Sequence, residues 1–268
     1  MKLLSFFVSI LLVAGIISTA HSVSSSVDES IRQDISLCFS EHMEIPDKTF
    51  KYQHEFEAAA EKYDLPLPFI LSVSRGESFF DSAAVSSAGA IGLMQVMPGT
   101  AIRYGYSAND LKNPKKNIDA GVHYLKDLYD EFQDPYLTLA GYYCGENTRS
   151  LKNGSNKIRS DCDEYVRYIY THFEQVMKFA KTGTKEYASA IPNFELADFR
   201  HISEVKNFMA LIRDKVDGLK LDMFREETKD TNGIIIFKYK VLVSFKNGKE
   251  KSTICSKIEK ETGFKFCK

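Results

Sequence analysis

Residues 69–79 are the stretch that most limits how this chain can fold, because nearly all of them are apolar or small. A helix made of such residues has no polar face, so other elements must surround it. Its polar exceptions, Arg75, Glu77 and Ser78, come near its end. A chain of 268 residues is long enough to bury such a helix in a core. The sequence therefore predicts a globular fold around one buried helix that carries a carboxyl near its end.

The rest of the first 180 residues also favours helices. Residues 51–63 are rich in Ala and Glu, and a shorter helix is expected at residues 31–39. Apolar side chains recur at three- and four-residue spacings in residues 118–132, 165–180 and 202–216, which is typical of amphipathic helices. The stretch between the buried helix and these helices contains Gly89 and Gly92, and it is expected to form a turn-rich loop or a short hairpin.

The C-terminal part of the chain has a different pattern. Residues 234–245 are β-branched and aromatic, and Asn247-Gly248 is a turn signal, so we expect a hairpin with a second short strand. Residues 231–268 contain nine Lys and three Glu, a net charge of +6, although the whole chain has a net charge of −1. We interpret this basic region as a solvated surface, with attachment to anionic envelope polymers as the functional hypothesis. The overall charge indicates no nucleic-acid partner.

The N-terminus has the pattern of an export signal. Lys2 is followed by an apolar run at residues 3–17 and by the small residues Ser18-Thr19-Ala20. The run is shorter than the roughly 18 residues that a spanning helix needs. We expect cleavage after Ala20 and an exported protein, periplasmic or secreted.

The cysteines are expected to form disulfides in that oxidising compartment. Two bridges can be drawn among five cysteines in several ways, and our hypothesis is Cys144–Cys162 and Cys255–Cys267, which leaves Cys38 over. The six His are scattered without metal-ligand spacing, so no metal site and no other cofactor is expected.

Glu77 is the candidate for chemistry. Phe79, Phe80, Met94 and Met97 follow it closely, and apolar surroundings raise the pKa of a carboxyl. A raised pKa suits a general acid near neutral pH. The structural alternative is that Glu77 pairs with Arg75 or caps a turn.

Four ordered blocks carry a family resemblance. Glu77-Ser78-Phe79-Phe80 is followed by Ala-Val-Ser-Ser-Ala-Gly-Ala-Ile-Gly-Leu-Met-Gln-Val-Met-Pro at residues 84–98. Asn113-Pro114 with residues 117–125, then residues 139–142, and finally Tyr165-Val166 come after it at matching distances. The stretch at residues 52–178 resembles the soluble lytic transglycosylase (SLT) family, goose-lysozyme-like enzymes that cleave the glycan strands of peptidoglycan.

The resemblance implies a mainly α fold: a lysozyme-like (SLT) helical domain, to which this chain adds a small C-terminal α+β appendix. Together with the export signal and the pattern changes along the chain, this gives a signal peptide at 1–20, an N-terminal extension at 21–50 and the SLT domain at 51–180. A helical segment at 181–230 and a small basic β-hairpin region at 231–268 are expected to follow. The resemblance implies the catalytic residue Glu77 and the substrate-binding residues Ser86, Gln95, Met97, Tyr142 and Tyr165.

The reaction that the resemblance implies uses one carboxyl as both acid and base. Glu77 protonates the oxygen between N-acetylmuramic acid and N-acetylglucosamine, then deprotonates the muramic acid C6 hydroxyl, which closes a 1,6-anhydro ring. Asp81 is the nearest second carboxyl and is interpreted as a turn residue. Tyr143 stands where the family pattern has Asn, which puts one substrate or scaffold contact in question.

Two alternative functions stay open. A lysozyme-type hydrolase on the same scaffold would use water in place of the C6 hydroxyl. A non-catalytic glycan-binding or assembly factor would serve an envelope-spanning machine. The partners expected are peptidoglycan glycan strands, with envelope-spanning secretion machinery as a further hypothesis, and the chain is expected to be a monomer.

Overall fold

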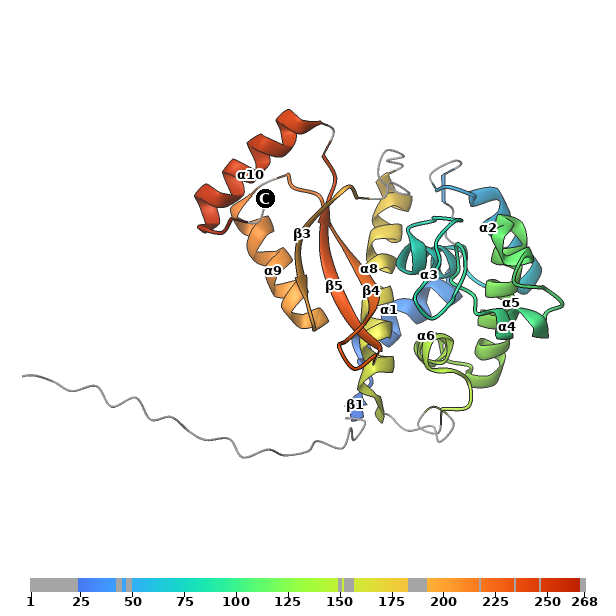
Figure 1. Ribbon diagram of the computed structural model, residues 1–268. Helices are drawn as coiled ribbons and strands as arrows, with labels where there is room; N and C mark the ends of the chain where they lie inside the picture. The colour runs from blue at the N-terminus through green and yellow to red at the C-terminus, as the bar shows by residue number, and fades with distance from the viewer. Residues whose placement is uncertain are drawn as a thin grey trace, which may run out of the picture.

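The computed structural model describes residues 24–41, 45–46, 50–148, 151, 157–182, 192–216, 218–233, 235–245 and 247–265. The expected signal peptide lies outside these residues. Figure 1 shows a helical body followed by a sheet with two helices of its own. The described elements are β1 (Ser24–Ser26), α1 (Glu29–Ser40), α2 (Gln53–Tyr63), α3 (Leu67–Ser78), α4 (Pro98–Arg103), η1 (Asp110–Lys112), α5 (Pro114–Phe132), α6 (Pro135–Cys144), β2 (Lys157–Arg159), α8 (Ser160–Thr182), β3 (Phe194–Phe199), α9 (Ile202–Lys215), β4 (Leu221–Lys229), β5 (Ile235–Val243) and α10 (Gly248–Thr262).

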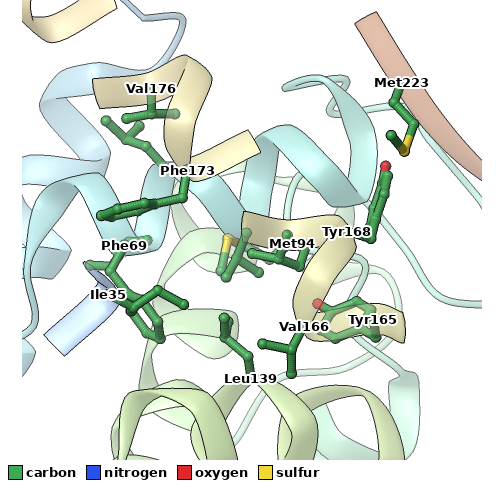
Figure 2. Packing of buried hydrophobic residues seen from close by; sticks show 14 of the residues in the cluster. Ile35, Phe69, Met94, Leu139, Tyr165, Val166, Tyr168, Phe173, Val176 and Met223 are labelled. Carbon is green, nitrogen blue, oxygen red and sulfur yellow. The ribbon is translucent and has the colours of Figure 1, made fainter. Parts of the chain in front are cut away.

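Helix α3 is the buried helix that the sequence predicts. It begins at Leu67 because Pro66 precedes it in extended conformation and Pro68 fits its first turn, where no backbone donor is needed. Its polar residue Arg75 is also fully buried. Figure 2 shows Ile35 of α1 beside Phe69 of α3, and Leu139 of α6 beside Val166 of α8, all in one buried cluster. The helices therefore form one core around α3.

The amphipathic helices begin at cap residues that can be read in the sequence. The Asn113 side chain accepts a hydrogen bond from the backbone N–H of Lys116 at the start of α5. The Asp134 side chain caps α6 in the same way. Such caps satisfy the free N–H groups of a first helical turn. The expected helices in this part of the chain are confirmed, and none of those described is long and apolar enough to cross a membrane.

The C-terminal prediction is wrong in two respects. Strand β5 does form a hairpin, but its partner is β4, which precedes it, and Asn232-Gly233 lies in the connection between them. Asn247-Gly248 is not a turn between strands: the Asn247 side chain accepts from the backbone N–H of Glu250 and begins α10. An Asn before a Lys- and Glu-rich stretch caps a helix as readily as it makes a turn.

Residues 181–230 are also not simply helical. Within the described part of that segment, α9 lies between the strands β3 and β4. The three strands form an antiparallel sheet in the order β3-β5-β4. Figure 1 shows this sheet between α8 on one side and α9 and α10 on the other. The edge strand β4 runs beside α3, which brings the appendix next to the residue of greatest chemical interest.

Candidate active site

Glu77 lies in the last turn of α3, where the chain leaves the core. Phe79 and Phe80 follow with φ of 49° and 59°, a left-handed conformation that non-glycine residues seldom adopt. Two such residues in succession turn the backbone sharply after the helix. Backbone strain of this kind is often found at functional sites. Glu77 is consequently held at the wall of a cleft on rigid backbone, with its side chain only partly exposed.

The carboxyl of Glu77 is held by a phenol. The Tyr165 hydroxyl donates a hydrogen bond of 2.5 Å to Glu77 Oε1. Burial raises the pKa of Glu77, and the repulsion of Glu227 adds to this, while the charge of Arg225 and the Tyr165 hydrogen bond oppose it. The pKa stays above its ordinary value, as the apolar surroundings predict. The alternative pairing with Arg75 does not occur, because the Arg75 guanidinium binds Asp222.

The glycine-rich block at residues 84–97 is held in place by the side chain of Asn117, which lies on α5. The Asn117 side chain accepts from the Met94 N–H at 2.8 Å and donates to the Ile91 and Leu111 carbonyls at 2.7 and 3.0 Å. Gly92 has φ of 76°, and a Cβ there would lie 2.4 Å from the Asn117 amide nitrogen. Only glycine satisfies both conditions. The block is thus a rigid loop on α5.

The cleft beside Glu77 has a volume of about 580 Å³. Five of the six predicted site residues line it: Glu77, Ser86, Gln95, Met97 and Tyr142. The Gln95 amide donates to the Ala84 and Gly92 carbonyls, and the Tyr142 hydroxyl donates to the Met94 carbonyl at 2.7 Å. These two side chains therefore brace the loop as well as line the cleft. Met97 is 42% exposed and open to a ligand.

Tyr165, the sixth predicted residue, does not line the cleft. Its side chain is 0% exposed and its hydroxyl donates to the Glu77 carboxyl, so in this structure Tyr165 positions that carboxyl. Asp81 matches its predicted turn role, because its carboxylate accepts from the backbone N–H of Ala83.

One wall of the cleft was not predicted from the sequence. Residues of β4 and β5 line it opposite the glycine-rich block, among them Arg225, Glu227 and Phe237. The Ser87 hydroxyl donates a hydrogen bond to Glu227 and joins the two walls. No local pattern marks these residues, since a charged strand edge is normally solvated. A strand prediction at residues 221–229 would have been the first signal.

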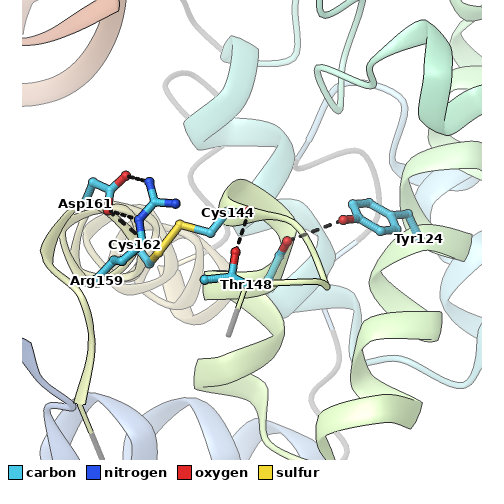
Figure 3. Close-up of a disulfide and its surroundings, with 7 residues drawn as sticks. Tyr124, Cys144, Thr148, Arg159, Asp161 and Cys162 are labelled. Atoms are coloured by element: carbon cyan, nitrogen blue, oxygen red, sulfur yellow. Dashed lines mark hydrogen bonds and ion pairs between the residues drawn. A yellow bond between two sulfur atoms is a disulfide. The ribbon is translucent and has the colours of Figure 1, made fainter. Parts of the chain in front are cut away.

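The Cys144–Cys162 disulfide forms as expected and ties α6 to α8 (Figure 3). Arg159 and Asp161 form an ion pair next to it, at the start of α8. Cys255 is disulfide-bonded, and its expected partner Cys267 lies outside the described residues. Cys38 is a free, buried thiol. In the described part of the chain, Cys144, Asp161 and Cys162 are the one group with metal-ligand proximity, and both sulfurs are in the disulfide.

Part of this chain is similar to known proteins. Residues 54–163 match the model of the transglycosylase SLT domain. A membrane-bound lytic murein transglycosylase C from Haemophilus influenzae is 38% identical over 102 residues, which are 35% of this chain and 28% of that protein. A soluble lytic murein transglycosylase from Escherichia coli is 30% identical over 127 residues, which are 44% of this chain and 20% of that protein.

A crystal structure of the 70 kDa soluble lytic transglycosylase from Escherichia coli aligns with a TM-score of 0.43 and 25% identity, over 48% of this chain and 24% of that one. The matched regions are thus less than a third of each of these proteins. Residues 54–163 thus match the transglycosylase SLT domain, as the motifs in this part of the chain predict. Strand β4 lies outside the matched residues.

Proposed function

We propose that this chain is an exported lytic transglycosylase of peptidoglycan. It cleaves the β-1,4 bond between N-acetylmuramic acid and N-acetylglucosamine and leaves 1,6-anhydro-muramic acid ends. The observation that carries the proposal is Glu77, a carboxyl of raised pKa at the wall of an open cleft in an SLT domain. A carboxyl that is protonated near neutral pH can donate its proton to a leaving oxygen.

Glu77 performs both proton transfers in this mechanism. It protonates the glycosidic oxygen, so the bond to C1 of the muramic acid breaks and the carboxyl becomes a carboxylate. The carboxylate then takes the proton of the C6 hydroxyl, whose oxygen bonds to C1. The 2.5 Å hydrogen bond from the Tyr165 hydroxyl holds Glu77 Oε1 in one position through both proton transfers. Atoms balance without a water molecule, and the Glu77 carboxyl ends as it began.

A hydrolase is the second candidate because of one observation. Glu227 of β4 lines the same cleft as Glu77, and a second carboxylate can activate water in an inverting glycosidase. Its hydrogen bond from Ser87 argues against this role, since the carboxylate is already used in joining the cleft walls. Under this candidate the product gains a water and has a reducing end.

Mass spectrometry of the products separates the candidates. Purified peptidoglycan is treated with the mature chain, with Glu77→Gln and with Glu227→Gln. Muropeptides one water lighter than hydrolysis products, absent with Glu77→Gln and present with Glu227→Gln, support the transglycosylase. Reducing-end products that require both carboxyls indicate the hydrolase. If folded, disulfide-intact protein cleaves nothing, a binding or assembly factor of an envelope machine is the better proposal.

Export is part of the proposal, because the substrate lies outside the cytoplasmic membrane. Cell fractionation tests it: the mature chain is expected in the periplasm or the medium and to be lighter by the mass of residues 1–20. A mature N-terminus at residue 21 is the expected result of sequencing.

A further inference from the structure

Strand β4 is docked against the residues that flank Glu77. The Asp222 carboxylate binds the buried Arg75 guanidinium through two hydrogen bonds of 2.9 and 2.5 Å. The Tyr168 hydroxyl donates to the Gly76 carbonyl at 2.6 Å and accepts from the backbone N–H of Arg225 at 3.2 Å. These contacts reach the two residues immediately before Glu77. The position of β4 relative to the catalytic carboxyl is therefore fixed, although the strand lies outside the SLT match.

A cation from this strand enters the cleft. The Arg225 guanidinium carbon lies 4.4 Å from the ring centres of both Tyr143 and Phe237, 4.8 Å from that of Tyr165 and 5.6 Å from that of Tyr168. Aromatic faces attract a guanidinium and hold its plane. Arg225 also lines the cleft, and its charge is felt by Glu77. The side chain is thus both oriented and accessible.

The carboxylates near Arg225 are otherwise engaged. Glu226 forms an ion pair of 2.9 Å with Lys240, Glu227 accepts from Ser87, and Glu77 accepts from Tyr165. Within the part of the chain that the structure describes, no carboxylate is within ion-pair distance of the Arg225 guanidinium. The aromatic rings around the Arg225 guanidinium contact it through their faces, and a ring face does not accept its N–H groups as an oxygen does. A guanidinium in this position has donors left for an anion that enters the cleft.

The ring at position 143 explains part of this arrangement. Tyr143 replaces the Asn of the family pattern, and its ring stacks on Tyr165 at 5.0 Å with an angle of 14° between the planes. The Phe237 ring packs against Tyr143 in a T-shaped arrangement, with 5.7 Å between the ring centres. An asparagine cannot provide this flat surface for a guanidinium. Tyr143, which departs from the family pattern, and Phe237 of the appendix thus pack around the same guanidinium, that of Arg225.

We propose that Arg225 is a specificity-determining residue of the cleft, whose guanidinium binds a carboxylate of the peptidoglycan strand; this rests on the function proposed above. A strand of neutral sugars offers no anion. Peptidoglycan offers two sources: the lactyl carboxylate of muramic acid where the peptide has been removed, and the carboxylates of the peptide where it is retained. A guanidinium recognises either one through two parallel hydrogen bonds.

Binding measured without turnover tests the proposal. In the Glu77→Gln background, calorimetry compares three probes: a neutral oligomer of N-acetylglucosamine, a peptide-free glycan fragment with a free lactyl carboxylate, and a peptide-bearing muropeptide. Adding Arg225→Gln is expected to weaken at least one carboxylate probe about tenfold or more and to leave the neutral oligomer unchanged. Whether the peptide-free or only the peptide-bearing probe weakens identifies which carboxylate is bound. Lys238→Gln on β5, which removes a charge paired with Asp198, is the matched control and should change none.

Three outcomes would overturn the proposal. Unchanged affinity for both carboxylate probes shows that Arg225 binds no substrate anion. An equal loss for all three probes shows a structural role only. If Arg225→Gln does not fold, Arg225→Lys is used in its place. A loss of affinity of Arg225→Lys for the neutral oligomer as well as for the carboxylate probes also shows a structural role only. Cleavage of peptidoglycan by the unmodified chain is measured in parallel, so that the proposed function can stand while this proposal fails.

Discussion

Replacement of Asn117 by leucine, which has the same number and branching of side-chain heavy atoms, is expected to loosen the glycine-rich block. Asn117 is 1% exposed and makes three hydrogen bonds, to Met94, Ile91 and Leu111. Leucine leaves one backbone N–H and two carbonyls buried without these partners. At about 1 kcal/mol for each hydrogen bond, the free energy of unfolding should fall by about 3 kcal/mol. For a domain of this size that corresponds to a lower Tm by about 6–12 °C.

Urea unfolding followed by circular dichroism measures this loss, and kcat/KM on peptidoglycan measures its effect on the cleft. The matched control is Asn113→Ala, the exposed cap of the same helix, which removes one hydrogen bond and should cost about 1 kcal/mol. The activity of Asn117→Leu should fall at temperatures where the variant is fully folded, because the loop carries Ser86 and Gln95. A stability loss no larger than that of Asn113→Ala would refute the reasoning.

Three further predictions concern the charges and the disulfide. Arg225→Gln removes the positive charge that lowers the pKa of Glu77, so the pKa of Glu77 is expected to rise. Because Glu77 acts as an acid, the fall of activity at alkaline pH then shifts to higher pH. A pH–rate profile with the same alkaline pKa in both proteins contradicts this. Asp222→Asn leaves the buried charge of Arg75 without its carboxylate and should lower the free energy of unfolding by about 3 kcal/mol in urea. The Cys144→Ser/Cys162→Ser double variant removes the cross-link between residues 18 positions apart and should lower the free energy of unfolding by about 3 kcal/mol, measured by urea unfolding without reducing agent; a loss below about 1 kcal/mol contradicts this.

His172 is neutral and is the second side chain that binds Arg75, so it stays as a partner of Arg75 in the Asp222→Asn variant. Burial and the nearby Arg75 charge lower the pKa of His172 well below its ordinary value. Its Nδ1 therefore accepts from the Arg75 guanidinium at 2.6 Å. Arg75 is thus held by one neutral and one charged partner, and only the charged one lies on β4.

The helical body was predictable because its signals are local. The apolar run before Glu77, the prolines that begin helices and the spacing of apolar residues each lie within one element. The turn-rich loop predicted around Gly89 and Gly92 is a local signal too, since both residues have positive φ, which glycine adopts readily. The Asn247 cap shows the limit of such signals, since the same residue suits a turn or a helix start.

The sequence by itself determined the order of the helices, the position of Glu77 and the loop beside it, and the SLT domain model that residues 54–163 match. Only the tertiary structure decided that Tyr165 lies beneath the carboxyl and that Arg225 enters the cleft. The contacts that place β4 join residues 147 and 140 positions apart, between Arg75 and Asp222 and between Ser87 and Glu227. Pairing over such separations depends on how whole elements pack, and no periodicity within one element encodes it.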